Sequence, residues 1–132
     1  MINKNYFENT IVNISNFVKV WGNNVNQPKI SAMVKHIVML RLKNYENKTQ
    51  KLENALKLKK ALEDMKFYIK ELKHLEVGLN FNEKPGAFDL VLSTSFESED
   101  DLEIYRMHPE HKKVLVFLRT VSDETAVVDY EI

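Results

Sequence analysis

Apolar and polar residues alternate over several short stretches of this chain, which is the pattern of strands. The first stretch covers residues 33–43, and its more apolar side consists of His36, Val38, Leu40 and Leu42. The opposite side is also half apolar, so the pattern predicts a strand that water reaches on neither face for much of its length. Further strands are predicted at residues 75–81, 87–96 and 121–132.

Two other segments have helical spacing. The first runs for roughly 20 residues, with apolar residues three, four and seven positions apart at Leu52, Ala55, Leu56, Leu62, Met65 and Ile69. We expect it to close near His74, at the negative end of the helix dipole. The second begins after Ser98, because Ser98 and Asp101 resemble a capping box. Proline disfavours the α conformation in the residue before it, so this helix is expected to break at His108 and restart from Pro109.

The predicted order is strand, helix, strand, strand, helix, strand. This is the β-α-β-β-α-β plan of ferredoxin-like α+β domains, with a four-stranded antiparallel sheet and helices on one face only. The other face would expose apolar side chains to water. A second copy of the same sheet would cover them, so we expect a homodimer that packs through this sheet face.

Composition narrows the classes of function. The 132 residues include 19 Lys and Arg against 19 Asp and Glu, so the chain lacks the positive charge that nucleic-acid binding needs. It has no cysteine, which excludes disulfides and thiolate sites and fits a cytoplasmic location. No apolar run approaches the roughly 20 residues of a membrane span, and the N-terminus resembles a signal peptide poorly. We therefore expect a single cytoplasmic domain with neither nucleic-acid nor membrane partners.

Residues 1–32 differ from the rest of the chain. They contain eight asparagines and few charges, and Pro28 follows a short apolar stripe at residues 11–21. We treat them as an N-terminal extension of uncertain role, either a docking segment or an addition without function, ahead of a domain at residues 33–132.

The predicted break at Pro109 brings together three side chains that can carry chemistry: Tyr105, His108 and His111. Six residues along an unbroken helix would leave Tyr105 and His111 about 120° apart in projection. At a bend they can meet, with His111 as general base and the Tyr105 hydroxyl as hydrogen-bond donor to a carbonyl or enolate oxygen. In the structural alternative, His108 caps the second helical segment and His111 binds backbone near the bend.

His36 lies in the middle of the first strand among apolar neighbours. It is either a satisfied core residue or, with His108, part of a ligand pocket. His36, His108 and His111 together would suit zinc, but no carboxylate lies at a spacing that demands a metal. We expect neither a metal nor a cofactor.

Several short motifs occur in a characteristic order. They are Val34-Lys35-His36-Ile37-Val38, Glu76-Val77-Gly78-Leu79-Asn80, Phe88-Asp89-Leu90-Val91-Leu92, Phe96-Glu97-Ser98, Tyr105, His108-Pro109-Glu110-His111 and Asp129-Tyr130-Glu131. Over residues 33–132 the chain thereby resembles the stress-responsive A/B barrel family. The resemblance implies a homodimeric α+β barrel. It also implies a pocket, since a similar plant polyketide cyclase uses a tyrosine and a histidine that match Tyr105 and His111, with a histidine that matches His36 nearby.

Three functions follow as hypotheses. The first is a homodimer with a small apolar ligand pocket and cofactor-free proton-transfer or cyclase-type chemistry on a small carbonyl compound. The second is a non-enzymatic stress-response or small-ligand-binding dimer, in which the same residues only shape the fold. The third is a dimeric-barrel monooxygenase that acts on haem or quinols.

Overall fold

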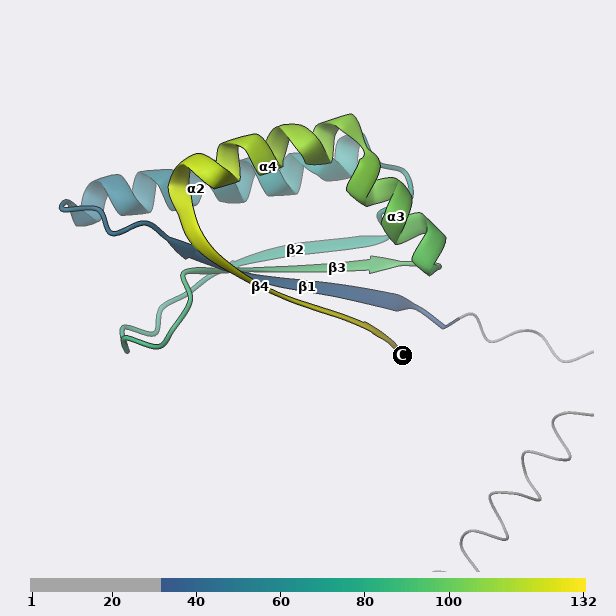
Figure 1. Cartoon of the computed structure of the whole chain (residues 1–132), viewed down its shortest axis with the longest axis horizontal. Helices are drawn as coiled ribbons and strands as arrows, with labels where there is room; N and C mark the ends of the chain where they lie inside the picture. Colours follow the sequence, from purple (N-terminus) through teal and green to yellow (C-terminus); the bar gives the residue numbers. More distant parts are fainter. Residues whose placement is uncertain (1–31) are drawn as a thin grey trace, which may run out of the picture. The chain divides into compact units, whose positions relative to one another are not determined.

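A computed structural model describes residues 32–132, which form a four-stranded sheet with helices packed on one side (Figure 1). The elements are β1 (Val34–Leu42), α2 (Lys48–Asp64), the short 3₁₀ helix η1 (Met65–Phe67), β2 (His74–Leu79), β3 (Leu90–Phe96), α3 (Glu99–Met107), α4 (Pro109–Val121) and β4 (Ser122–Glu131). The strand order is β2-β3-β1-β4, and every neighbouring pair is antiparallel. The predicted ferredoxin-like plan is confirmed. The predictions for residues 1–31 lie outside the described part of the chain.

The core lies between the sheet and the helices. Strands β1 and β3 are central, and the alternate residues that face the helices are the most deeply buried, among them Leu40, Leu90 and Phe96. Leu58 of α2 and Tyr105 of α3 close this layer, and neither exposes any surface. The alternation read from the sequence of β1 therefore identifies the side that faces the core.

The opposite side of the sheet is the open face, which we define by Ile37, Met39, Val91, Ala126 and Val128. Met39 lies opposite Val91 on one side and Ala126 on the other, and Ile37 lies opposite Val128. All three α-helices lie on the other side of the sheet (Figure 1). No element of the described chain covers the open face, so Met39 and Val128 remain 41% and 58% exposed.

Helix α2 ends earlier than predicted. Asn47 caps its start, with the side-chain oxygen accepting from Thr49 N at 2.8 Å, but regular α-helix stops at Asp64. The next turn tightens to the 3₁₀ form of η1, and the chain then leaves the helix. The prediction that His74 lies at a helix end is wrong. His74 is instead the first residue of β2, and its Nε2 lies 3.8 Å from Oε2 of Glu76.

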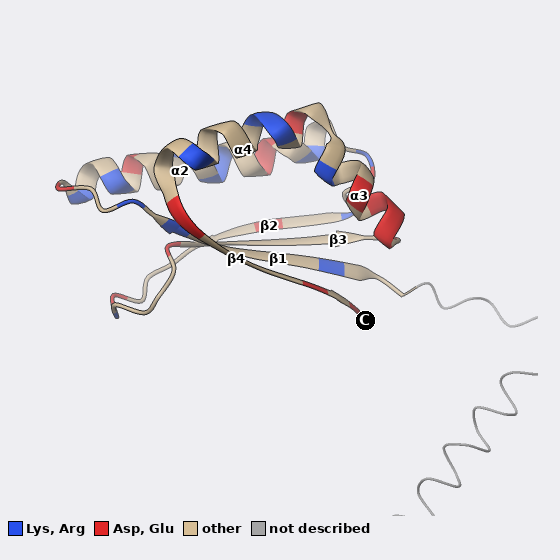
Figure 2. Cartoon of the chain, in the orientation of Figure 1, with Lys and Arg blue, Asp and Glu red and all other residues tan. Residues whose placement is uncertain are grey.

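The predicted helix break is confirmed. Ser98 Oγ accepts from Asp101 N at 3.1 Å and begins α3, whose first turn is acidic (red in Figure 2). Negative charge there favours the positive end of the helix dipole. His108 then takes an extended conformation, and Pro109 opens α4 at a position where its missing N–H costs nothing. Basic and acidic residues are interspersed along α2, whereas the charged residues of α4 are Glu110 near its start and then only basic ones (Figure 2).

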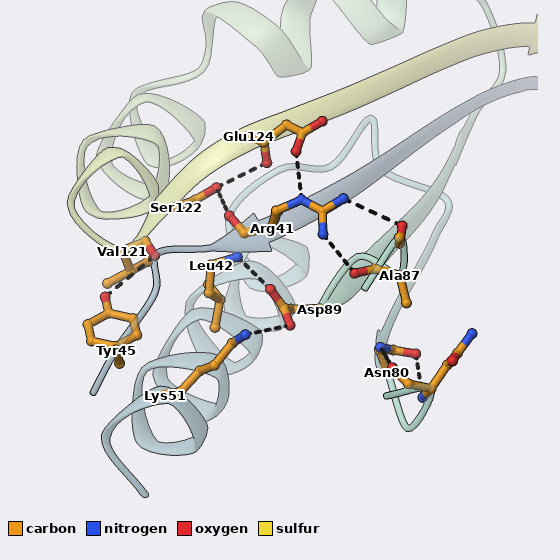
Figure 3. Close-up of polar contacts among 12 residues, drawn as sticks. Arg41, Leu42, Tyr45, Lys51, Asn80, Ala87, Asp89, Val121, Ser122 and Glu124 are labelled. Carbon is orange, nitrogen blue, oxygen red and sulfur yellow. Dashed lines mark hydrogen bonds and ion pairs between the residues drawn. The ribbon is translucent and has the colours of Figure 1, made fainter. Parts of the chain in front are cut away.

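Strand β3 begins at Leu90, three residues later than predicted, because side chains before it bind the end of β1 (Figure 3). Asp89 accepts from Leu42 N at 2.7 Å and lies 3.1 Å from Lys51 Nζ. The guanidinium of Arg41 lies 4.3 Å above the ring of Phe88. These contacts hold the β2–β3 connection against the start of α2. Between residues 32 and 132, no helix is long and apolar enough to cross a membrane.

Candidate functional site

Tyr105 and His111 meet at the junction of α3 and α4, as the break at Pro109 predicts. Their ring centroids are 4.4 Å apart, with an angle of 48° between the planes. The Tyr105 ring also contacts Phe96 at 5.0 Å and His36 at 5.9 Å. Three of the four residues selected from the sequence, His36, Tyr105 and His111, thus form one cluster between β1 and the two helices.

The His111 imidazole is held through one nitrogen. Nδ1 lies 3.0 Å from the carbonyl oxygen of Arg106. A carbonyl only accepts, so Nδ1 carries the proton and Nε2 of the neutral ring keeps its lone pair. Burial lowers the pKa of His111. The hydrogen bond to Arg106 opposes this effect, while positive charge at His36, Arg106 and His108 lowers the pKa further. The ring is therefore neutral at physiological pH, as a general base must be.

The Tyr105 hydroxyl is fully buried, and it has no hydrogen-bond partner among the residues that the structure describes. Burial also raises the pKa of Tyr105 well above its usual value, although the Arg106 charge opposes this. The hydroxyl therefore stays protonated and keeps its capacity to donate. Buried hydroxyls are rarely left without a partner, so this one is suited to donate to a polar atom from outside the described chain.

The His36 imidazole is paired with a carboxylate that the sequence analysis did not select. Its Nδ1 lies 2.5 Å from Oδ1 of Asp129, which is the residue directly opposite on β4. The other carboxylate oxygen of Asp129 accepts from Arg106, which in turn pairs with Glu103. A chain of charged groups thus leads from the surface of α3 to a buried histidine.

A cavity of about 700 Å³ opens between β1, β4 and α4. His36, Arg106 and His111 line one end, and Val38, Leu115 and Val127 belong to its apolar wall. Arg119 lies at the other end, eight residues along α4 from His111 or about 12 Å at the helical rise. The cavity is of the size and apolar character typical of small-molecule sites.

The end of the cavity near Arg119 is fixed by a polar network (Figure 3). Arg41 donates to Glu124 at 2.6 Å and to the carbonyl of Ala87 at 2.9 Å. Ser122 Oγ donates to the carbonyl of Arg41 at 2.7 Å. Because Ser122 and Glu124 both line the cavity, these contacts hold its far wall in place.

His108 lies apart from the cavity. Its Nδ1 accepts from Glu110 N at 3.1 Å, so the side chain caps α4. Neither His108 nor Tyr105 is among the residues that line the cavity. Both contacts of the structural alternative are therefore present, namely the His108 cap and the bond from His111 to backbone. Within residues 32–132, no three His, Cys, Asp or Glu side chains group closely enough to hold a metal ion.

Asp129 and Arg106 are the residues that sequence reasoning missed. Asp129 is 93 positions from His36, and only the register of β1 against β4 brings the two together. In the sequence, Asp129 occurs only as part of the motif Asp129-Tyr130-Glu131, which supports the family resemblance but gives no indication of a contact with His36. Nothing in the pattern around Arg106 distinguishes it from the other charged residues on exposed helical surface.

The fold and this cluster define a ferredoxin-like α+β domain with a cavity between its sheet and its last helix. The model of the stress-responsive A/B barrel domain matches residues 34–132. The chain belongs to this family. No curated protein matches it.

Solved structures agree with this assignment. A protein from Bacteroides fragilis, described as dimeric, of unknown function and with a ferredoxin-like fold, is 36% identical, covers 76% of this chain and 96% of its own, and has a TM-score of 0.69. A dimeric ferredoxin-like protein from Thermobifida fusca is 21% identical, with coverages of 83% and 100% and a TM-score of 0.64. A hydroxynitrile lyase from Passiflora edulis is 16% identical, with coverages of 77% and 94% and a TM-score of 0.63. The last two show a shared fold.

Proposed function

We propose that this protein is a cytoplasmic homodimer whose cavity binds a small apolar carbonyl compound and transfers a proton on it without a cofactor. His111 acts as the base, through Nε2. The Tyr105 hydroxyl donates to the oxygen that becomes the enolate, and His36 contacts the ligand. The observation that carries the proposal is the His111 ring, which lines an apolar cavity with its pKa lowered and one nitrogen free.

The Tyr105 part of the proposal has a geometric requirement. Since Tyr105 does not line the cavity and its hydroxyl is buried, a ligand oxygen reaches that hydroxyl only if the side chains packed around it move. The missing partner of that hydroxyl supports the proposal, because a ligand oxygen would satisfy it. The His108 side chain caps α4 and does not line the cavity, so its predicted contact with ligand requires His108 to leave this cap.

The homodimer is proposed to pack through the open face. Its apolar centre, Ile37, Met39, Val91, Ala126 and Val128, is the part of the sheet that no described helix covers. The relative from Bacteroides fragilis is described as dimeric, which supports the same assembly here. A hydroxynitrile lyase of the same fold supports the view that the fold accommodates an enzyme active site.

Hydrogen–deuterium exchange tests the chemistry. Cyclohexanone in D₂O, followed by ¹H NMR, should exchange its α-protons faster in the presence of the protein. General base catalysis contributes about 10²–10⁴-fold, so His111→Gln should remove at least about 100-fold of the acceleration. His74→Gln is the matched control, because His74 is an exposed histidine on β2. Equal exchange with the wild type and His111→Gln would refute the base assignment.

A second function, ligand binding without turnover, is favoured by one observation. The hydrogen bonds of His108 and His111 to backbone are those that a purely structural role requires. This function predicts that cyclohexanone shifts cavity resonances such as those of Val127 and Leu115 while its α-protons exchange at the uncatalysed rate.

A further inference from the structure

Both imidazoles at the cavity are held through one residue of α3. The main-chain carbonyl of Arg106 accepts from His111 Nδ1 at 3.0 Å. The guanidinium of Arg106 donates to Oδ2 of Asp129, and Oδ1 of Asp129 accepts from His36 Nδ1 at 2.5 Å. The last turn of α3 therefore reaches one histidine through its backbone and the other through its side chain.

The side-chain route needs Arg106, because the other partner of the Asp129 carboxylate in the described chain is His36 itself. Asp129 lies on the edge strand β4, and its side chain is 35% exposed. Water can therefore compete for this carboxylate, and a second partner is needed to fix its orientation toward His36. A planar guanidinium binds two acceptors in a fixed arrangement, and here Glu103 and Asp129 occupy two of its nitrogens.

We propose that Arg106 is a positioning residue, which through Asp129 fixes the ring of His36 in the tautomer with the proton on Nδ1 and leaves Nε2 for a ligand in the cavity. A carboxylate on one ring nitrogen sets which form the other nitrogen takes. Whether Nε2 of His36 then contacts a ligand depends on the proposed function. The placement of the ring is a property of the ligand-free protein, so it is tested without any substrate.

The test is a two-bond ¹H–¹⁵N correlation spectrum of the full-length ¹⁵N-labelled protein, at a pH where the rings are neutral. The wild type should show His36 and His111 each as one tautomer with the proton on Nδ1. In Arg106→Met, the His36 nitrogens should move to averaged positions that report both tautomers. His111 should keep its pattern in the same sample, because its acceptor is main chain and survives the substitution.

Arg119→Met is the matched control. Arg119 also lines the cavity from α4, but has no ion pair with Asp129, so both histidines should keep the wild-type pattern. Should Arg106→Met fail to fold, as judged by circular dichroism, Arg106→Gln replaces it, since glutamine keeps a polar side chain without the charge. A His36 pattern unchanged in a folded Arg106 variant overturns the proposal, as does a wild-type His36 with its proton on Nε2.

Discussion

The phenol of Tyr105 and the imidazole of His111 lie 4.4 Å apart between ring centroids, although the two residues are six positions apart in the sequence. One continuous helix would turn the two side chains about 120° away from each other. The extended conformation of His108 before Pro109 changes the direction of the chain, so the last turn of α3 and the first turn of α4 face the same interior point.

Removal of the Tyr105 hydroxyl should make the protein more stable but less active. The hydroxyl is buried without a described partner, so Tyr105→Phe should raise the free energy of unfolding by about 1 kcal/mol. The same variant should lose acceleration of exchange on cyclohexanone. Urea denaturation measures the first effect. A decrease in stability would show that the hydroxyl has a hydrogen-bond partner in the free protein. It would then contradict the argument that this hydroxyl is available to donate to a ligand oxygen.

Stability should fall on acidification because of His111. Its pKa is lowered in the folded state from an ordinary value of 6.5, so the unfolded chain binds more protons between the two pKa values. His111 therefore lowers the free energy of unfolding once the pH drops below about 6.5, and it has no such effect well above that pH. Urea midpoints between about pH 5 and pH 8 should show a flatter dependence for His111→Gln than for the wild type. Parallel curves would contradict the buried, neutral ring.

The His108 side chain should matter for the start of α4. His108→Ala removes the acceptor for Glu110 N and should lower the free energy of unfolding by about 1 kcal/mol. His108→Asn should recover most of the loss, because asparagine is among the preferred residues at this position. If asparagine restores stability but not cyclohexanone binding, His108 also contacts the ligand. If it restores both, the cap is its whole role.

A charge placed in the open face should dissociate the proposed dimer. Met39→Glu puts a carboxylate among Val91, Ala126 and Val128, so it should weaken association by at least about 2 kcal/mol, or roughly thirty-fold. Leu56→Glu is the control, because Leu56 is similarly exposed but lies on α2, on the side of the sheet away from this face. Sedimentation velocity over a range of concentrations measures both. A Met39→Glu variant that associates like the wild type would place the dimer interface elsewhere.

Local signals in the sequence predicted the elements well where one residue determines the backbone. Ser98 began α3, and Pro109 broke the helix, because a cap and a missing N–H act within a few residues. The end of α2 was predicted wrongly because no residue of this kind marks it. Residues 65–68 contain neither glycine nor proline, so nothing local marks the change to 3₁₀ geometry before His74.

The candidate site was predicted only in part, because its parts depend on strand register. Tyr105 and His111 were found from their spacing around one bend. The Asp129 carboxylate meets His36 only because β4 pairs with β1 at that register, and a shift of one residue would turn Asp129 to the open face. Such a partner cannot be read from spacing along the chain.

The pairing of β1 with β4 also determines when this cluster comes into existence. It joins the two ends of the described domain, with 93 positions between His36 and Asp129, and contacts so distant in sequence are slow to form. A subunit in which the helices and the β2–β3 hairpin have already formed would still lack an oriented His36. Any change that disrupts the pairing of β1 with β4 should therefore release the His36 ring, which makes this histidine a reporter of the contact between the two ends of the domain.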